Sequence, residues 1–227
     1  MKITKVLILL LAGLCFAGDG MFINYSFGGI FDKVRSSDGD HDRWEYDQIT
    51  EEHVYKGTYE SELRKINGKG GDVAFKIGSE ITPYFSLYLS FDASVSFGTF
   101  KYKLHDFDKK WTRYDSGSTR HYMLGIGSSV MPFPDTSSIL HGLFFNGAFA
   151  FGILNTWNGE ESDKYGSDYH IAYSYGTVDM IAEVGKLWRI GQKFYLGGYF
   201  KYVLNLVPYP NYYSLGAGVT GSWKIFP

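Results

Sequence analysis

Two neighbouring runs of the sequence, 73–81 and 85–97, alternate between apolar and polar residues almost without interruption. The second run places its apolar residues at Phe85, Leu87, Leu89, Phe91, Ala93, Val95 and Phe97. Because successive side chains of a β-strand point to opposite faces, this period of two predicts two strands. Thr82-Pro83-Tyr84 between the runs predicts a tight turn. The alternation leaves one question open, since a soluble barrel turns its apolar face inward and a membrane barrel turns it toward lipid.

The same alternation recurs along the chain and predicts eight strands. We expect them at residues 21–31, 73–81, 85–104, 121–131, 140–154, 171–188, 193–207 and 213–226. Their connections alternate in character: the odd-numbered ones are long or rich in proline, and the even-numbered ones are short. Outer-membrane barrels have short periplasmic turns and longer extracellular loops. We therefore predict an all-β fold, an eight-stranded antiparallel up-and-down transmembrane barrel over residues 18–227, with a long extracellular loop at 32–71. Neither register of that loop gives an uncharged face, so we expect it not to cross lipid, and strands that extend above the membrane are an alternative there.

The N-terminal segment has the features of a secretory signal peptide. Lys2 and Lys5 precede an apolar run at 6–14, and Cys15-Phe16-Ala17 places small residues where a signal peptidase cleaves. We expect residues 1–17 to be removed. The run is shorter than the roughly 20 residues of a membrane helix. Lipidation of Cys15 is an alternative that the preceding Leu14 disfavours. Cleavage after Ala17 leaves no cysteine, and hence no disulfide, in the mature chain.

Within the cores of the predicted strands, the apolar faces carry no charge; Lys101 and Lys186 fall on an apolar face only near a strand end. The polar residues expected to form a network in the lumen are Lys76, Glu80, Asp92, Asn146, Asp179, Glu183, Lys201 and Asn205. Lipid demands this segregation, because Lys or Arg on a lipid-facing position costs about 2–4 kcal/mol at the midplane. A soluble lipocalin-like barrel needs a charged exterior, whereas the polar faces here are mostly Gly, Ser, Ala and Tyr. Since eight strands leave room for little more than side chains, we expect a plugged lumen. A small pore or ligand-transport barrel is the alternative.

Aromatic residues are abundant, with 19 Tyr and 18 Phe, and several lie near strand ends. We expect Tyr84, Trp157, Trp188 and Trp223 to belong to two aromatic girdles at the membrane interfaces. The partners expected on this basis are outer-membrane lipids. The net charge of −2 argues against nucleic acid. We expect a monomer.

With its strand count, its loop rhythm and a last strand ending Trp223-Lys224-Ile225-Phe226, the sequence resembles the small outer-membrane barrels of the OmpA, OmpX and OmpW type. The resemblance implies a bacterial outer-membrane location and recognition of Trp223, Ile225 and Phe226 by the barrel-assembly machinery. Pro227 after Phe226 departs from the usual terminal aromatic residue. We expect no peptidoglycan-binding domain, so the resemblance does not imply peptidoglycan anchoring.

The sequence contains no motif that specifies a metal, a cofactor or a reaction. The acidic segment 38–42 would hold a hard cation only weakly, and an EF-hand alignment fails because Trp44 and Glu45 occupy required positions. A lipid-modifying enzyme remains a further alternative, since histidines and serines lie near the loop ends of strands. These residues are His105, His121, His170, Ser118 and Ser174. The main expectation is a non-enzymatic barrel with a structural or surface-interaction role, whose loops bind an extracellular ligand or host surface.

Overall fold

The computed structural model describes residues 20–36, 40–47, 52–106, 109–158, 161–162, 168–169, 172–208 and 210–225. These residues form the strands β1 (Gly20–Ser36), β2 (Asp40–Asp47), β3 (Glu52–Thr82), β4 (Phe85–Asp106), β5 (Lys109–Val130), β6 (Leu143–Asn158), β7 (Glu161–Ser162), β8 (Asp168–Tyr169), β9 (Ala172–Arg189), β10 (Phe194–Asn205) and β11 (Asn211–Lys224). The predicted signal peptide 1–17 lies outside the described residues.

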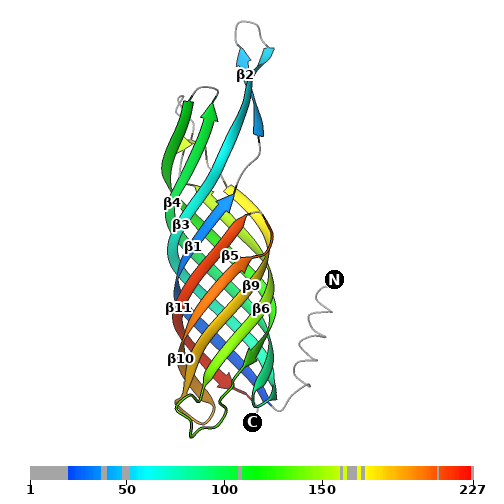
Figure 1. Ribbon diagram of the computed structural model, residues 1–227, viewed down its shortest axis with the longest axis vertical. Coiled ribbons are helices and arrows are strands. Elements are labelled where there is room, and N and C mark those ends of the chain that lie inside the picture. Colours follow the sequence, from blue (N-terminus) through cyan, green and yellow to red (C-terminus); the bar gives the residue numbers. More distant parts are fainter. Residues whose placement is uncertain are drawn as a thin grey trace.

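Eight of these strands form one closed barrel (Figure 1). They follow the order β1-β11-β10-β9-β6-β5-β4-β3, and β1 also pairs with β3, so the sheet has no free edge around the wall. Every pairing is antiparallel, which confirms the predicted fold class. Among the described residues there is no helix that is long and apolar enough to cross a membrane.

The barrel turns its apolar face outward. Phe200 is 69% exposed and Phe151 is 76% exposed, whereas Asp92 and Asp179 are buried inside. The exposed aromatic residues recur around the wall and include Phe27, Phe31, Phe91, Phe97 and Phe149. A water-soluble barrel has the opposite arrangement, because exposing this much aromatic surface to water is unfavourable. The outer surface between the two barrel ends, called the apolar belt below, is therefore the lipid-facing part of a transmembrane barrel.

Paired strands extend far into the predicted loop at 32–71. β1 continues to Ser36, which pairs with Arg64 of β3. Above the barrel, β2 pairs with β3 from Asp40↔Glu60 onward, and this extension rises above the wall in Figure 1. The strand boundaries expected at residues 31 and 73 therefore differ from the structure. Charges on both faces mark the limit of lipid, whereas backbone hydrogen bonding continues in water.

The predicted second loop, 105–119, differs from the structure for the same reason. β4 and β5 remain paired up to Asp106↔Lys109, beyond the apolar belt. The two paired extensions, β2 with β3 and β4 with β5, stand at the same end of the barrel (Figure 1). This end is called the upper end below.

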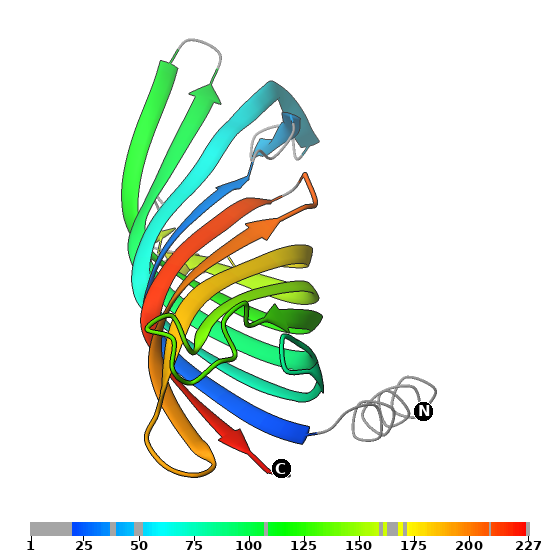
Figure 2. The same ribbon diagram turned by 60° about the horizontal axis from the view of Figure 1, so that its bottom comes forward.

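The opposite, lower end carries the turns at 83–84, 131–142 and 190–193. The connection 131–142 is longer than the expected turn, and β6 begins at Leu143 instead of residue 140. Gly142 has a φ of +81°, and its carbonyl accepts a hydrogen bond from the Leu187 backbone at 2.9 Å. In the same connection, hydrogen bonds from Ser137 hold the pKa of the Asp135 carboxyl below its usual range. Figure 2 shows this connection as a long green loop at the lower end.

Candidate functional site

The barrel interior is lined by a column of polar groups whose centre is Lys201 on β10. Its ammonium donates to Asp72 of β3 and lies 3.4 Å from Asp92 Oδ1 of β4. The Tyr199 hydroxyl also donates to Asp72, at 3.3 Å. The Lys201 and Asp72 side chains are only 3% and 1% exposed, respectively. A buried charge must be paired, and here one lysine serves two carboxylates.

Below this centre, Lys76 of β3 donates to Glu183 of β9. The same carboxylate accepts a hydrogen bond from Asn146 Nδ2 of β6 at 2.6 Å. The Lys76 ammonium also lies 5.5 Å from the centre of the Tyr88 ring. Asn146 and Glu183, which are paired on the neighbouring strands β6 and β9, thus meet Lys76 of β3 across the lumen.

Above the centre lie two carboxylates without a lysine partner among the described residues. Asp179 Oδ2 is 3.1 Å from His121 Nε2 and accepts from the Thr177 hydroxyl at 2.6 Å. Asp32 accepts hydrogen bonds from the hydroxyls of Ser96 and Thr119. The Oδ1 oxygens of both carboxylates have no hydrogen-bond partner in the part of the chain that the structure describes. The interior therefore carries more acids than bases among the described residues.

The remaining predicted lumen residues do not join this central network. Glu80 pairs with Lys224 at the lower end, with side chains 24% and 36% exposed. Asn205 instead binds backbone groups near the upper end, donating to the Pro210 carbonyl at 2.6 Å and accepting from the Val207 amide at 3.1 Å. Asn205 thus fixes the connection between β10 and β11.

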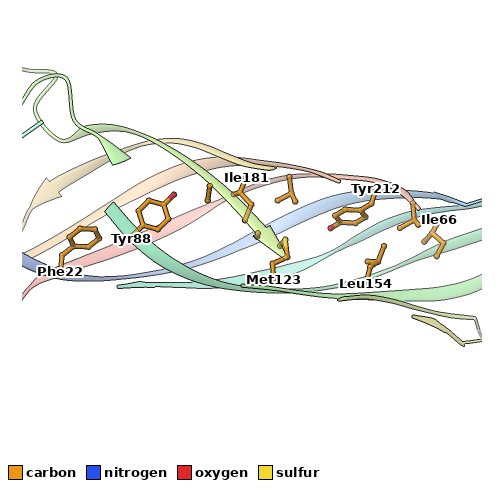
Figure 3. Close-up of a cluster of buried hydrophobic side chains, with 11 residues drawn as sticks. Phe22, Ile66, Tyr88, Met123, Leu154, Ile181 and Tyr212 are labelled. Carbon is orange, nitrogen blue, oxygen red and sulfur yellow. The ribbon is translucent and has the colours of Figure 1, made fainter. Parts of the chain in front are cut away.

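Apolar side chains fill the space between these polar groups. Figure 3 shows Phe22 and Tyr88 toward one end of the interior, Met123 and Ile181 between, and Tyr212, Leu154 and Ile66 toward the other. Tyr212 and Leu154 are fully buried, so the upper end of the lumen is packed with side chains. A cavity of about 340 Å³ remains at the lower end, lined in part by the 131–142 connection.

Sequence reasoning missed four residues of the interior. Asp72 precedes the apolar run by one residue, but it lies an even number of positions from Lys76 and therefore on the same face of the strand. Asp32 falls in the predicted loop at 32–71, and the sequence predicts no ion pair for Lys224. The sequence places His121 only at a strand end. The alternation of inward and outward positions continues beyond the apolar residues, and this continuation places Asp72 and Asp32 inside.

The four girdle residues lie on the outer surface near strand ends. Tyr84, Trp188 and Trp223 are 55%, 55% and 52% exposed at the lower end, and Trp157 is 46% exposed at the upper end. The Ile225 amide donates to the Met21 carbonyl at 2.7 Å. Phe226 lies outside the described residues. The roles of the girdle and of the C-terminal assembly signal stay predictions.

Among the described residues, the groups of the enzyme alternative do not share one face. Ser118 and Ser174 line a groove on the outer surface. His121 is 1% exposed and lies in the interior against Asp179. The side chain of His105, and all of His170, lie outside the described residues. The described part of the chain also contains no cluster of three metal-ligating residues, and the expected weak cation segment 38–42 lies partly outside it.

A closed wall, an apolar exterior and a paired polar interior define a transmembrane β-barrel. The structure is similar to three solved outer-membrane proteins. Ail, the attachment invasion locus protein of Yersinia pestis, is 11% identical, with 91% of this chain and 99% of that one covered and a TM-score of 0.43. Neisserial surface protein A is 14% identical, with 91% and 97% covered and a TM-score of 0.43. The outer-membrane protease OmpT from Escherichia coli is 10% identical, with 92% and 97% covered and a TM-score of 0.41.

No protein-family model and no curated protein match the sequence.

Proposed function

We propose that the protein is a non-conducting barrel of the bacterial outer membrane that presents its upper strand extensions to extracellular partners. The observation that carries the proposal is the continuation of β2 with β3, and of β4 with β5, above the apolar belt. A membrane strand needs only about 9–11 residues, whereas β3 has 31. The additional length supports a role outside the membrane, where paired strands give a rigid surface for a partner.

The packed lumen supports a non-conducting barrel. Tyr212 and Leu154 fill its upper part, and the Lys201 and Lys76 ion pairs cross its middle. We expect single barrels in a planar bilayer to show no discrete conductance steps. The small-pore alternative draws its support from the unpartnered oxygens of Asp32 and Asp179, where water would bind. Discrete channels in the bilayer would select that alternative.

The surface role is tested by shortening one extension. Replacing residues 40–60 by a short Gly-Ser turn removes the β2–β3 extension and retains the pairing of β1 with β3 from Arg64 onward. Bacteria that display the full chain should attach to an epithelial cell monolayer more strongly than bacteria that display the shortened chain at equal surface density. The matched control replaces residues 131–142, at the lower end, by a linker of equal length. Equal attachment by the full and shortened chains would contradict the proposal.

The enzyme alternative has a separate test. No described residue that lines the groove of Ser118 and Ser174 is a histidine, so we expect the acylation of lipid A to be unchanged when the gene is deleted. A changed acylation pattern would favour an enzyme.

A further inference from the structure

The outer surface of the wall contains a groove of about 450 Å³ at the upper edge of the apolar belt. Three strands form it, and their register aligns Arg120 of β5 with Asn155 of β6 and Asn155 with Ser174 of β9. Ser118 and Trp157 form the next pair upward. Arg120, Asn155 and Ser174 thus form a polar row along the groove. The small side chain of Ser118 lies beside this row, and the aromatic side chains of Tyr122 and Trp157 stand at the margins.

Among the described residues, Arg120 is the only charged one that lines this groove. No described lining residue is acidic, and the described residues offer Arg120 no salt bridge. Arg120 is also exposed on the outward face, two positions above the exposed Tyr122. An arginine there is unfavourable within the hydrocarbon and is accommodated near the interface, where anionic groups are available. A guanidinium forms paired hydrogen bonds with phosphate, and the Asn155 amide and the serine hydroxyls add donors.

The surface directly below the groove is apolar. Tyr122, Leu124 and Ile153 are 44%, 48% and 53% exposed and continue down the wall from Arg120 and Asn155. A ligand that fits both parts has an anionic head and alkyl chains that run along the belt. The groove opens outward from the barrel, so such a molecule reaches it from the membrane.

We propose that this groove binds the phosphate-bearing head group of a lipid in the upper leaflet, which is the outer leaflet in the proposed orientation. Arg120 binds the phosphate, Asn155, Ser118 and Ser174 donate further hydrogen bonds, and the acyl chains pack on Tyr122 and Ile153. The site rests on the transmembrane placement of the barrel and not on the partner of the upper extensions.

The test is native mass spectrometry of the full chain extracted in detergent, titrated with diphosphorylated lipid A and with its dephosphorylated form. We expect one phosphorylated lipid to bind preferentially and Arg120→Gln to weaken that binding by roughly tenfold, the effect of losing a charge-assisted hydrogen bond. The matched control, Lys193→Gln, removes an exposed cation at the lower end and should leave binding unchanged. Ser174→Phe retains every charge, fills the groove and should also reduce binding.

Three results would overturn the site. They are equal loss of binding in Arg120→Gln and Lys193→Gln, unchanged binding in Arg120→Gln, and equal binding of the dephosphorylated lipid. Inorganic pyrophosphate that competes at the affinity of the lipid would mean a site for free anions and would also overturn the proposal. Each variant is first checked for a folded barrel by its gel mobility before heating, so that failure to fold is separated from loss of the site. Cell attachment by the same variants tests the surface role independently.

Discussion

Replacing Lys201 by methionine removes the cation that two buried carboxylates share. The side chain keeps its length and apolar stem, so the change is chiefly one of charge. Asp72 and Asp92 are then left facing each other without the ammonium, each nearly inaccessible to solvent. Removing one partner of a buried ion pair costs about 3–5 kcal/mol. We therefore expect the folding equilibrium constant of Lys201→Met to fall by roughly a hundredfold or more, since about 1.4 kcal/mol corresponds to a factor of ten.

The measurement is urea unfolding of the barrel in lipid vesicles, followed by tryptophan fluorescence. Lys224→Met is the matched control, because its pair with Glu80 is partly exposed and should contribute at most about 1 kcal/mol. Replacing the whole group, with Lys201→Met, Asp72→Leu and Asp92→Leu combined, should recover most of the loss, because no buried charge is left unpaired. If Lys201→Met loses no more stability than Lys224→Met, the Lys201 ion pairs are not buried in the way described here, and a water-filled lumen screens these charges.

Three further predictions address the belt, the lower end and the plug. Phe200→Arg, in the middle of the belt, should lower the free energy of unfolding in vesicles by about 2–4 kcal/mol. Phe97→Arg, similarly exposed but near the upper edge, should lower it by at most about 1 kcal/mol. Equal losses of stability would contradict a lipid-facing belt. Gly142→Ala should lower stability by roughly 1–2 kcal/mol in the same assay, because its φ of +81° disfavours a side chain and a methyl group would collide with the Leu187 carbonyl. Gly191→Ala, where a methyl group meets no atom within 4 Å, is the control and should be nearly neutral. The double variant Tyr212→Gly and Leu154→Gly should produce conductance steps in a planar bilayer that the unmodified chain lacks. If neither the double variant nor the unmodified chain conducts, the ion pairs alone close the lumen.

The outer surface was predictable residue by residue because lipid imposes a simple rule on it. Phe200 and Phe151 face outward as the period of two requires, and the charged residues of the strand cores face inward. The same rule failed above the belt. Residues 52–71 carry charges on both faces, so the apolar pattern does not place strand ends there, whereas backbone pairing requires no apolar face.

The pairing of groups across the lumen was not predictable from the sequence. Lys76 and Glu183 are 107 positions apart and lie on strands that are not neighbours in the wall. The contact between Lys76 and Glu183 depends on the register of every strand pair between them. The apolar–polar pattern of one strand contains no information on that register. The groove on the outer surface has the same origin, since the register across β5, β6 and β9 aligns Arg120, Asn155 and Ser174.

Gel mobility shows whether this chain forms a closed barrel within a membrane. The membrane fraction is extracted in detergent and run on a denaturing gel with and without prior heating. We expect a protein that requires detergent for extraction and that migrates differently before and after heating, because the closed hydrogen-bonded wall withstands the detergent until it is heated. A protein that is soluble without detergent and has one mobility under both conditions would contradict it.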